Sequence, residues 1–269
     1  MSAVETAGRR NFALITGAST GIGYELTKLF ARDGYQLVLV ARNPQRLTEV
    51  KDELQRQFHV SVTVVSKDLA LAQAPDELFA ELQREGIAVD VLVNNAGFGT
   101  HGFFAESDLA MQRGMMQVNM AAPTHLVRLF LPGMIKRGAG RILNVASTAA
   151  FQPGPLMAVY YASKAYVLSF SEALANELRG SGVSVTVLCP GPTKTEFQRR
   201  AGVEETQLMR SGIMDARAVA VAGYRGLMTG RTVVIPGTRN RVLAAAVKFL
   251  PRSLVTRVVR NIQEKRTPL

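Results

Sequence analysis

The stretch "NFALITGASTGIGYELTKLF", residues 11–30, decides the fold. A short apolar run ends at Gly17, and an amphipathic segment with a helical pattern begins at about Gly23. Gly17 allows a tight turn, while Gly21 and Gly23 let a pyrophosphate and the neighbouring strand approach the backbone beside a helix N-terminus. The spacing is GxxxGxG rather than GxGxxG, and alone it could be plain turn chemistry. Between a strand and a helix, it predicts a phosphate-binding turn.

Six further apolar runs, rich in β-branched residues, alternate with amphipathic segments. They cover residues 35–41, 61–68, 89–97, 140–147, 183–191 and 231–237. Such runs are typical of strands buried on both faces, and the segments 23–34 and 43–58 are helical in pattern. The alternation predicts an α/β fold, a doubly wound parallel sheet of about seven strands (Rossmann fold). Because 47% of the 269 residues are hydrophobic and no linker or repeat is visible, we expect one domain over residues 1–269.

The net charge of +11 is concentrated near the C-terminus. From Arg231 to Leu269 there are nine Lys or Arg residues and one acid, Glu264, so this part carries +8 and the preceding residues +3. No nucleic-acid-binding motif accompanies these cations. We therefore do not expect nucleic-acid binding.

The numbers and positions of cysteine and histidine narrow the possible classes of protein further. The single cysteine, Cys189, excludes an internal disulfide and a thiolate zinc cluster, and it indicates a reducing compartment. The three histidines, His59, His101 and His125, lack ligand-like spacing, so no metal site is expected. The N-terminus has no apolar signal core, and no apolar run approaches the ~20 residues that span a bilayer. We expect a cytoplasmic protein, soluble or peripheral on a membrane.

Six separated motifs carry the functional prediction. They are "TGASTGIG" at 16–23, "NNAG" at 94–97, Asn119 in "VNM", Ser147 in "NVAS", "YYASK" at 160–164 and "PG" at 190–191. In order and spacing they resemble the short-chain dehydrogenase/reductase family, over residues 11 to about 200. The resemblance implies an oxidoreductase that transfers a hydride between a nicotinamide cofactor and a carbonyl or alcohol group.

The segment "VYYASKAYV", residues 159–167, holds three tyrosines around one lysine. The family pattern Tyr-x-x-x-Lys selects Tyr160 and Lys164. On a helix, residues i and i+4 share one face, so the Lys164 ammonium can lie beside the Tyr160 phenol, whereas Tyr161 points about 100° away. A phenol with a pKa of ~10 is a poor acid-base catalyst at neutral pH, and a nearby cation lowers that pKa. This is the expected purpose of the lysine.

The resemblance assigns roles to four catalytic residues. It implies that Tyr160 protonates the forming alkoxide and that Ser147 holds the carbonyl oxygen. It also implies that Asn119 anchors a water that relays protons to Lys164. Taken singly, each of these residues could serve packing, capping or solvation instead. Their joint occurrence in family order favours the catalytic interpretation.

The end of the second predicted strand indicates which cofactor binds. An acid there bonds the ribose 2′-hydroxyl of NAD, whereas a nearby arginine accommodates the 2′-phosphate of NADP. Here the run ends at Ala41 and Arg42 follows without a carboxylate, so NADP(H) is favoured over NAD(H). The resemblance further implies that Asp68 contacts the adenine and that Thr193 and Thr195 hold the nicotinamide carboxamide. The predicted cofactor set is Gly17, Ser19, Thr20, Gly21, Ile22, Gly23, Arg42, Asp68, Leu69, Asn94, Ala96, Gly97, Tyr160, Lys164, Pro190, Gly191, Thr193 and Thr195.

The substrate pocket is predicted from apolar segments near the catalytic residues. The almost wholly apolar segment 148–159 should form one wall, and Phe98 a second. Residues of about 193–215 correspond to a mobile substrate loop in the family. This loop mixes apolar residues with arginines, namely Phe197, Leu208, Met209, Ile213 and Met214 with Arg199, Arg200 and Arg210. The mixture suits a hydrophobic carbonyl compound with an acidic end, such as a 3-oxoacyl thioester. A plain ketone or a steroid-like substrate fits nearly as well, and a solvated helix that simply packs is about equally consistent.

The basic C-terminal tail, about 238–269, contains a predicted amphipathic helix. Its apolar face comprises Leu254, Val255, Val258, Val259 and Ile262, with Arg252, Arg257 and Lys265 largely off that face. Such a helix either packs on its own domain or a partner subunit, or makes peripheral contact with an anionic membrane. The resemblance also implies a homodimer or homotetramer, through a helix from about Ala105 to Lys136 and the helix that carries Tyr160.

The sequence therefore predicts an NADP(H)-dependent oxidoreductase for a hydrophobic carbonyl or alcohol substrate. The alternative is a non-catalytic NADPH-sensing protein that acts through its basic tail. The four catalytic residues speak against that alternative, because sensing alone requires none of them.

Overall fold

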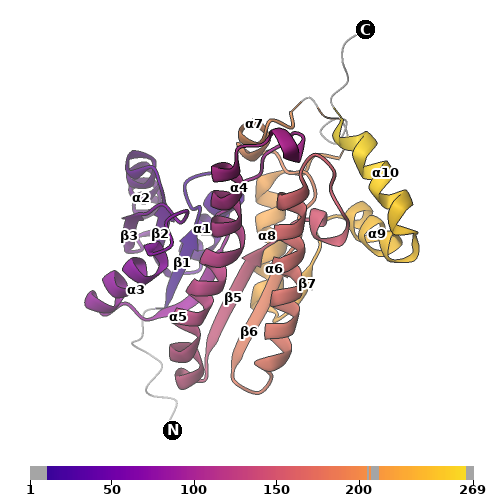
Figure 1. The fold of residues 1–269 in the computed structure, drawn as a ribbon. Coiled ribbons are helices and arrows are strands. Elements are labelled where there is room, and N and C mark those ends of the chain that lie inside the picture. The colour runs from indigo at the N-terminus through magenta and orange to yellow at the C-terminus, as the bar shows by residue number, and fades with distance from the viewer. Residues whose placement is uncertain (1–10, 205, 207–211, 265–269) are drawn as a thin grey trace.

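A parallel sheet of seven strands runs through the molecule in the order β3-β2-β1-β4-β5-β6-β7 (Figure 1). The computed structural model describes residues 11–204, 206 and 212–264. The strands are β1 Phe12–Thr16, β2 Gln36–Ala41, β3 Val62–Ser66, β4 Val89–Asn94, β5 Gly140–Val145, β6 Val183–Leu188 and β7 Val233–Val234. The strand order reverses between β1 and β4, and ligands of open parallel sheets bind at such a switch point. The predicted fold class and strand number are confirmed.

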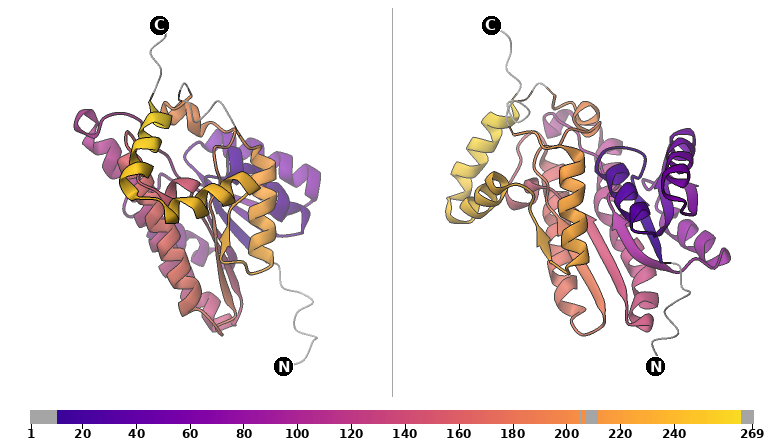
Figure 2. Two further views of the ribbon diagram at one scale, coloured as in Figure 1. Left: turned by 90° about the vertical axis from the view of Figure 1, so that its right-hand side faces the viewer. Right: turned by 180° about the vertical axis from the view of Figure 1, so that it is seen from behind.

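Helices cover both faces of this sheet (Figures 1 and 2). The helices α1, α2 and α8 pack on one face, and α3, α5 and α6 pack on the other. Their bounds are α1 Gly21–Arg32, α2 Pro44–Phe58, α3 Ala74–Arg84, α5 Ala122–Arg137, α6 Ala158–Glu177 and α8 Ala216–Met228. Alternate strand residues enter opposite cores: Ile15 and Leu39 lie beneath α1 and α2, and Leu14 and Val40 belong to the other core. Both faces of the strands are buried, which explains their uniformly apolar sequences.

The long helix expected from about Ala105 to Lys136 begins later and is interrupted. It consists of α4 Leu109–Met116, a π-helical turn η2 Gln117–Ala121, and α5. A short 3₁₀ turn, η1 Phe104–Glu106, precedes it. The interruption contains Asn119, one of the predicted catalytic residues, and π-turns inside helices often mark functional sites.

The C-terminal part forms a helical corner at the edge of the molecule beyond β7 (Figures 1 and 2). It comprises α9 Thr238–Ala246, a 3₁₀ turn η5 Val247–Phe249, and α10 Arg252–Gln263. On α10, Val255 and Val259 are buried, whereas Leu254 and Val258 remain exposed. The predicted apolar face therefore divides into an inner part that packs and an outer part that does not. In the ranges that the structure describes, no helix is long and apolar enough to cross a membrane.

The predicted substrate loop follows β6, and its described residues include a short helix, α7 Phe197–Ala201. Its two ends are joined by a bridge between Thr193 and Met214, with hydrogen bonds from Lys194 N to Met214 O and from Met214 N to Pro192 O. Leu208, Met209 and Arg210 of this loop, and Lys265 of the tail, lie outside the described residues.

Candidate active site

The glycine turn between β1 and α1 leaves little room for any side chain. Gly17 and Gly21 have φ angles of 64° and 59°, in the left-handed region that favours glycine. A Cβ on Gly23 would lie 2.2 Å from the Gly17 carbonyl oxygen. Thr20 makes no side-chain cap at the start of α1, and the first turn of that helix has no acidic residue. The first amide groups of α1 are therefore available to an anion such as a pyrophosphate.

The segment after β4 is fastened to the glycine turn. Asn95 Nδ2 donates to the carbonyl oxygens of Thr16 and Gly17, at 3.0 and 3.1 Å. The Thr16 hydroxyl accepts from the amides of Asn95 and Ala96, both at 3.0 Å. Asn94 points into the sheet instead, where its Nδ2 donates to Asn144 Oδ1 at 2.9 Å. The "NNAG" motif thus ties β4 to its neighbours β1 and β5 at the carboxyl edge of the sheet.

Tyr160 and Lys164 share one face of α6, as their spacing predicts. The Lys164 Nζ lies 5.7 Å from the centroid of the Tyr160 ring and donates to the Val145 carbonyl oxygen at 2.9 Å. The adjacent Tyr161 turns away, and its hydroxyl accepts from Gln263 Nε2 of α10 at 2.7 Å. The two neighbouring tyrosines therefore have different surroundings: one faces the predicted catalytic lysine and the other a C-terminal helix.

Burial dominates the electrostatics of this pair. It raises the pKa of Tyr160 above its usual value, and a hydrogen bond with Ser147 acts in the opposite direction. Burial also lowers the pKa of Lys164, to about 8. The causes of the raised pKa of Tyr160 include no contribution from Lys164, so the lowering expected of this lysine stays a prediction. Tyr160 is thus held as a neutral phenol, a group that can donate a proton.

Ser147 follows β5 and faces the turn after β6. Its hydroxyl accepts from the Ala149 amide at 3.1 Å and is 3.4 Å from the Pro190 carbonyl oxygen. That same Pro190 oxygen accepts from the Thr148 amide at 2.8 Å. The predicted "PG" motif therefore supports the segment that carries Ser147.

Asn119 uses its side chain to hold the segment after β4. Its Oδ1 accepts from the Phe98 amide at 3.1 Å, and its Nδ2 donates to the Phe98 carbonyl at 2.9 Å. Nδ2 also donates to Ser163 Oγ at 3.0 Å. A Cβ on Gly97 would lie 3.1 Å from Asn119 Oδ1 and 3.3 Å from Lys164 Nζ. Asn119 and Lys164 therefore meet at Gly97, although the relay water assigned to Asn119 stays a prediction.

The predicted adenine end lies at the ends of β2 and β3. These ends are adjacent, because Ala41 pairs with Ser66 and the Ser66 hydroxyl donates to the Arg42 carbonyl at 3.1 Å. The Arg42 side chain is exposed. Asp68 Oδ1 accepts from the Ala70 amide at 3.0 Å, which fixes the turn after β3. Arg42 and Asp68, which are predicted to contact the adenosine part of the cofactor, thus lie at the same edge of the sheet.

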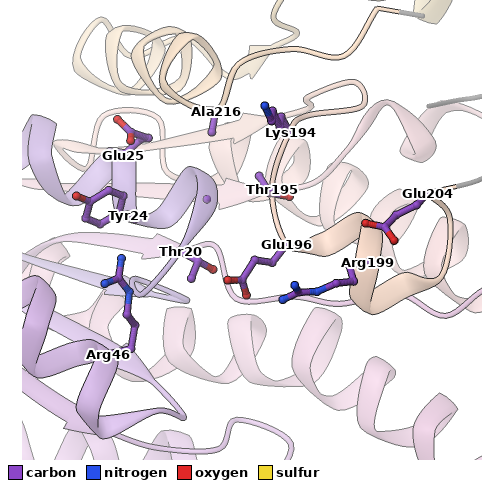
Figure 3. A pocket seen from close by; sticks show the side chains of 11 residues that line it. Thr20, Tyr24, Glu25, Arg46, Lys194, Thr195, Glu196, Arg199, Glu204 and Ala216 are labelled. Carbon is purple, nitrogen blue, oxygen red and sulfur yellow. The ribbon is translucent and has the colours of Figure 1, made fainter. Parts of the chain in front are cut away.

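A cleft of about 490 Å³ opens beside the glycine turn, between α1, α2 and the loop after β6 (Figure 3). Thr20 and Thr195 line it together with Arg46, which the sequence analysis did not single out. The Arg46 guanidinium lies 5.9 Å from the centroid of the Tyr24 ring. Arg46 is therefore a second cation near the predicted phosphate-binding end of the site.

Thr193 and Thr195 are held by one glutamine of α7. Gln198 Oε1 accepts from the amide and the hydroxyl of Thr195, at 3.1 and 3.2 Å, and its Nε2 donates to the Thr193 carbonyl. A Cβ on Gly21 would lie 2.9 Å from Thr195 Cγ2, so this threonine reaches the glycine turn. The loop after β6 thus closes over the site from the side opposite the "NNAG" segment.

A cavity of about 380 Å³ adjoins Tyr160, and its lining is mixed, with Glu106 and Asp108 among the polar residues. Its lining includes Phe103, Phe104, Leu156 and Met157. The prediction that the segment 148–159 forms a wall is supported by Leu156 and Met157. Phe98, the second predicted wall, packs with Leu69 and Val118 instead.

The substrate loop contributes one ring to the site and places its arginines elsewhere. The ring of Phe197 lies 5.2 Å from that of Tyr160, centroid to centroid. Arg199 lines the cleft beside the glycine turn, and Arg200 pairs with Glu196. The described arginines of the loop thus do not support the acidic substrate end that the sequence suggested.

The family model for short chain dehydrogenase matches residues 11–206. The chain belongs to the short-chain dehydrogenase/reductase family. As an enzyme of this family it is an oxidoreductase that acts on carbonyl or alcohol groups of small molecules. The glycine turn, the Tyr160-Lys164 pair and Ser147 all fall inside the matched range.

Three proteins illustrate the likeness within the short-chain dehydrogenase/reductase family. The ketoacyl reductase HetN of Nostoc is 31% identical, over 88% of this chain and 82% of that protein. A short-chain dehydrogenase from Sphingobium yanoikuyae, solved in complex with NADPH, is 30% identical, with a TM-score of 0.80 over 96% of this chain and 98% of that one. A short-chain dehydrogenase/reductase from Burkholderia phymatum, solved with NAD, is 29% identical, with a TM-score of 0.78 over 97% and 98% of the two chains.

Several side chains of this short-chain dehydrogenase/reductase were not found from the sequence. Asn95 and Ser163 lie inside recognised motifs, so their positions were the available signal. Arg46, Gln198 and Gln263 belong to helices, where their spacing looks like that of ordinary surface residues. Within residues 11–204, 206 and 212–264, no three His, Cys, Asp or Glu side chains gather where they could hold a metal ion.

Proposed function

We propose that this enzyme reduces a hydrophobic ketone or aldehyde with NADPH, reversibly, to the alcohol. The observation that carries the proposal is the position of Tyr160. This half-buried phenol lines a cavity, shares a helix face with Lys164 and interacts with Ser147, which lowers its pKa. A proton donor at the wall of such a cavity suits a carbonyl oxygen that gains negative charge during reduction.

The turn between β1 and α1 fits a dinucleotide. A Cβ on Gly17, Gly21 or Gly23 would fill the space beside the turn. The first backbone amides of α1 have no side-chain cap. These amides would hold the pyrophosphate, while Thr193 and Thr195 would hold the nicotinamide carboxamide. When bound, the cofactor supplies or accepts the hydride.

Residues of the chain itself transfer the proton and hold the substrate oxygen. The Ser147 hydroxyl donates a hydrogen bond to the carbonyl oxygen, and Tyr160 transfers its phenolic proton to the same atom. The Lys164 ammonium, with a pKa of about 8, is protonated at neutral pH and stabilises the resulting phenolate. Asn119 holds Gly97 and Phe98 in place beside Lys164, and we propose that it also anchors the relay water.

We propose that NADP(H) is preferred over NAD(H). Arg42 follows β2 with an exposed side chain, no carboxylate occupies the end of that strand, and Arg46 adds a second cation nearby. An arginine bond to a phosphate is worth roughly 1.5–3 kcal/mol, or about 10- to 150-fold in affinity. Arg42→Ala should weaken NADPH binding by such a factor and leave NADH binding nearly unchanged. Equal losses for both cofactors would contradict the assignment.

The substrate class follows from the cavity beside Tyr160. The apolar residues of its lining, among them Phe103, Phe104 and Met157, suit an apolar chain or ring system, and its polar residues, among them Thr100 and Gln112, can bond a polar group of a 3-oxoacyl thioester, a bulky ketone or a steroid-like ketone. The ketoacyl reductase HetN supports the first of these. Consumption of NADPH should be measured across medium and long 3-oxoacyl thioesters, steroid ketones and small aromatic carbonyls. Turnover of one of these substrate classes supports the proposal. Absence of turnover across the whole panel, with NADPH binding intact, would refute it.

That panel also separates the enzyme from the NADPH-sensing alternative, which predicts binding without turnover.

We further propose that the enzyme is cytoplasmic and forms a homodimer or homotetramer through α5 and α6. Exposed apolar side chains on these helices, Ile135 and Tyr166, support such a contact. Light scattering of the purified protein tests the oligomeric state.

A further inference from the structure

The corner between α9 and α10 exposes apolar side chains between cations. Phe249, at the end of η5, is 88% exposed, and Val242 and Leu250 are 62% and 46% exposed. Lys248 and Arg252 are exposed on either side of Phe249 and Leu250. Figures 1 and 2 show this corner at the margin of the molecule, on the side away from α2 and α3. Within residues 11–204, 206 and 212–264, this aromatic ring at a projecting corner is left almost wholly uncovered.

The outer side of α10 continues this exposed apolar region. Leu254 and Val258, one turn apart on the same face, are 44% and 48% exposed. The neighbouring face of the helix, with Val255 and Val259, is buried in a cluster that includes Met157. The helix is therefore apolar over a wider sector than its packing on the domain uses.

The charge along this part of the chain is almost wholly positive. From Arg231 to Glu264 there are seven Lys or Arg residues and a single acid, Glu264, which pairs with Arg260 at 2.7 Å. A second copy of the chain docking here face to face would bring the same cations against these ones, and like charges in an interface disfavour that contact. A partner that is anionic at its surface and apolar beneath would complement both these cations and the exposed apolar side chains.

We propose that the exposed side chains of residues 242–258, called here the corner surface, dock on an anionic phospholipid bilayer. Phe249 enters the apolar boundary of the bilayer, and Lys248 and Arg252 contact lipid phosphates. This arrangement matches interfacial helices, whose apolar sector enters the boundary while cations remain at the headgroups. Each cation near an anionic leaflet strengthens binding about fivefold, and removing one large aromatic ring from water strengthens it about tenfold or more.

Sedimentation with vesicles tests the proposal without any substrate. The full chain is mixed with vesicles of phosphatidylcholine alone or of phosphatidylcholine and phosphatidylglycerol. We expect binding to the anionic vesicles only, weakening as salt is raised. Phe249→Ala should lower the partition coefficient about tenfold, and the double variant Lys248→Glu/Arg252→Glu by more than that. Both changes are at exposed positions, and Glu at residue 252 suits the first turn of α10, so the fold should persist.

The matched control is the double variant Arg56→Glu/Arg84→Glu, which changes the net charge equally at exposed positions on α2 and α3. It should bind anionic vesicles almost as the wild type does. Absence of binding by the wild type overturns the proposal, as does equal weakening by both double variants, which would indicate attraction by net charge alone. Loss of a dimer in Phe249→Ala, without vesicle binding by the wild type, would assign the corner surface to a second copy of the chain instead.

Discussion

Tyr161→Phe removes one hydroxyl next to Tyr160, the proposed catalytic tyrosine, and should affect stability rather than catalysis. The Tyr161 hydroxyl accepts from Gln263 Nε2 at 2.7 Å, and the two residues are 6% and 1% exposed. Without the hydroxyl, a buried amide loses its partner, which costs about 1–3 kcal/mol. A chain of this size loses about 2–4 °C in Tm per kcal/mol, so the expected decrease is roughly 2–12 °C.

The measurements are thermal unfolding and hydrogen exchange of the α10 amides, with NADPH turnover as the activity readout. Exchange of α10 should accelerate more than that of β1 or β4, because the lost bond joins α10 to α6. The matched control is Tyr166→Phe on the same helix, whose hydroxyl bonds Thr124 at an exposed position and should cost at most about 0.5 kcal/mol. If Tyr161→Phe unfolds like the wild type and loses turnover instead, the division of roles between the two tyrosines is wrong.

Two further variants test the cofactor turn and the lysine. Gly23→Ala places a Cβ 2.2 Å from the Gly17 carbonyl oxygen and should weaken NADPH binding at least about tenfold, as titration of cofactor fluorescence would measure. The control Gly114→Ala on α4, where the nearest neighbour is Phe98 Cζ at 3.8 Å, should bind normally. Unchanged binding by Gly23→Ala would contradict the close approach. For carbonyl reduction, kcat/KM should fall as pH rises through about 8, because Lys164 loses its proton there. In Lys164→Arg the residual activity should lack this alkaline limb of the pH profile, because a guanidinium stays charged. A limb that stays at the same pH in Lys164→Arg would assign it to another group.

The sheet and the shared helix face of Tyr160 and Lys164 were predictable because their signals are local. Both faces of a parallel strand are buried, so β2 and β6 appear in the sequence as continuous apolar runs. The glycine turn requires backbone positions that only glycine occupies easily, and the Tyr160-Lys164 spacing places both residues on one face of a helix. None of these inferences needs contacts between distant parts of the chain.

Features that depend on distant contacts were missed or predicted wrongly. The Tyr161–Gln263 hydrogen bond joins residues 102 positions apart, and no periodicity in α10 marks Gln263 as its partner. The pKa of Tyr160 rises because the folded chain buries the phenol, whereas the sequence shows only that a lysine is close. The helix expected from Ala105 contains a π-helical turn at Asn119, which hydrophobic spacing does not reveal.

Tyr160→Phe tests the central claim most directly. Single-turnover reduction of an accepted carbonyl substrate by bound NADPH should slow about 10²- to 10⁴-fold, because the proton donor is lost. The dissociation constant for NADPH should change little, and Tyr161→Phe should retain turnover under the same conditions. Hydride transfer at the wild-type rate in Tyr160→Phe would contradict the account.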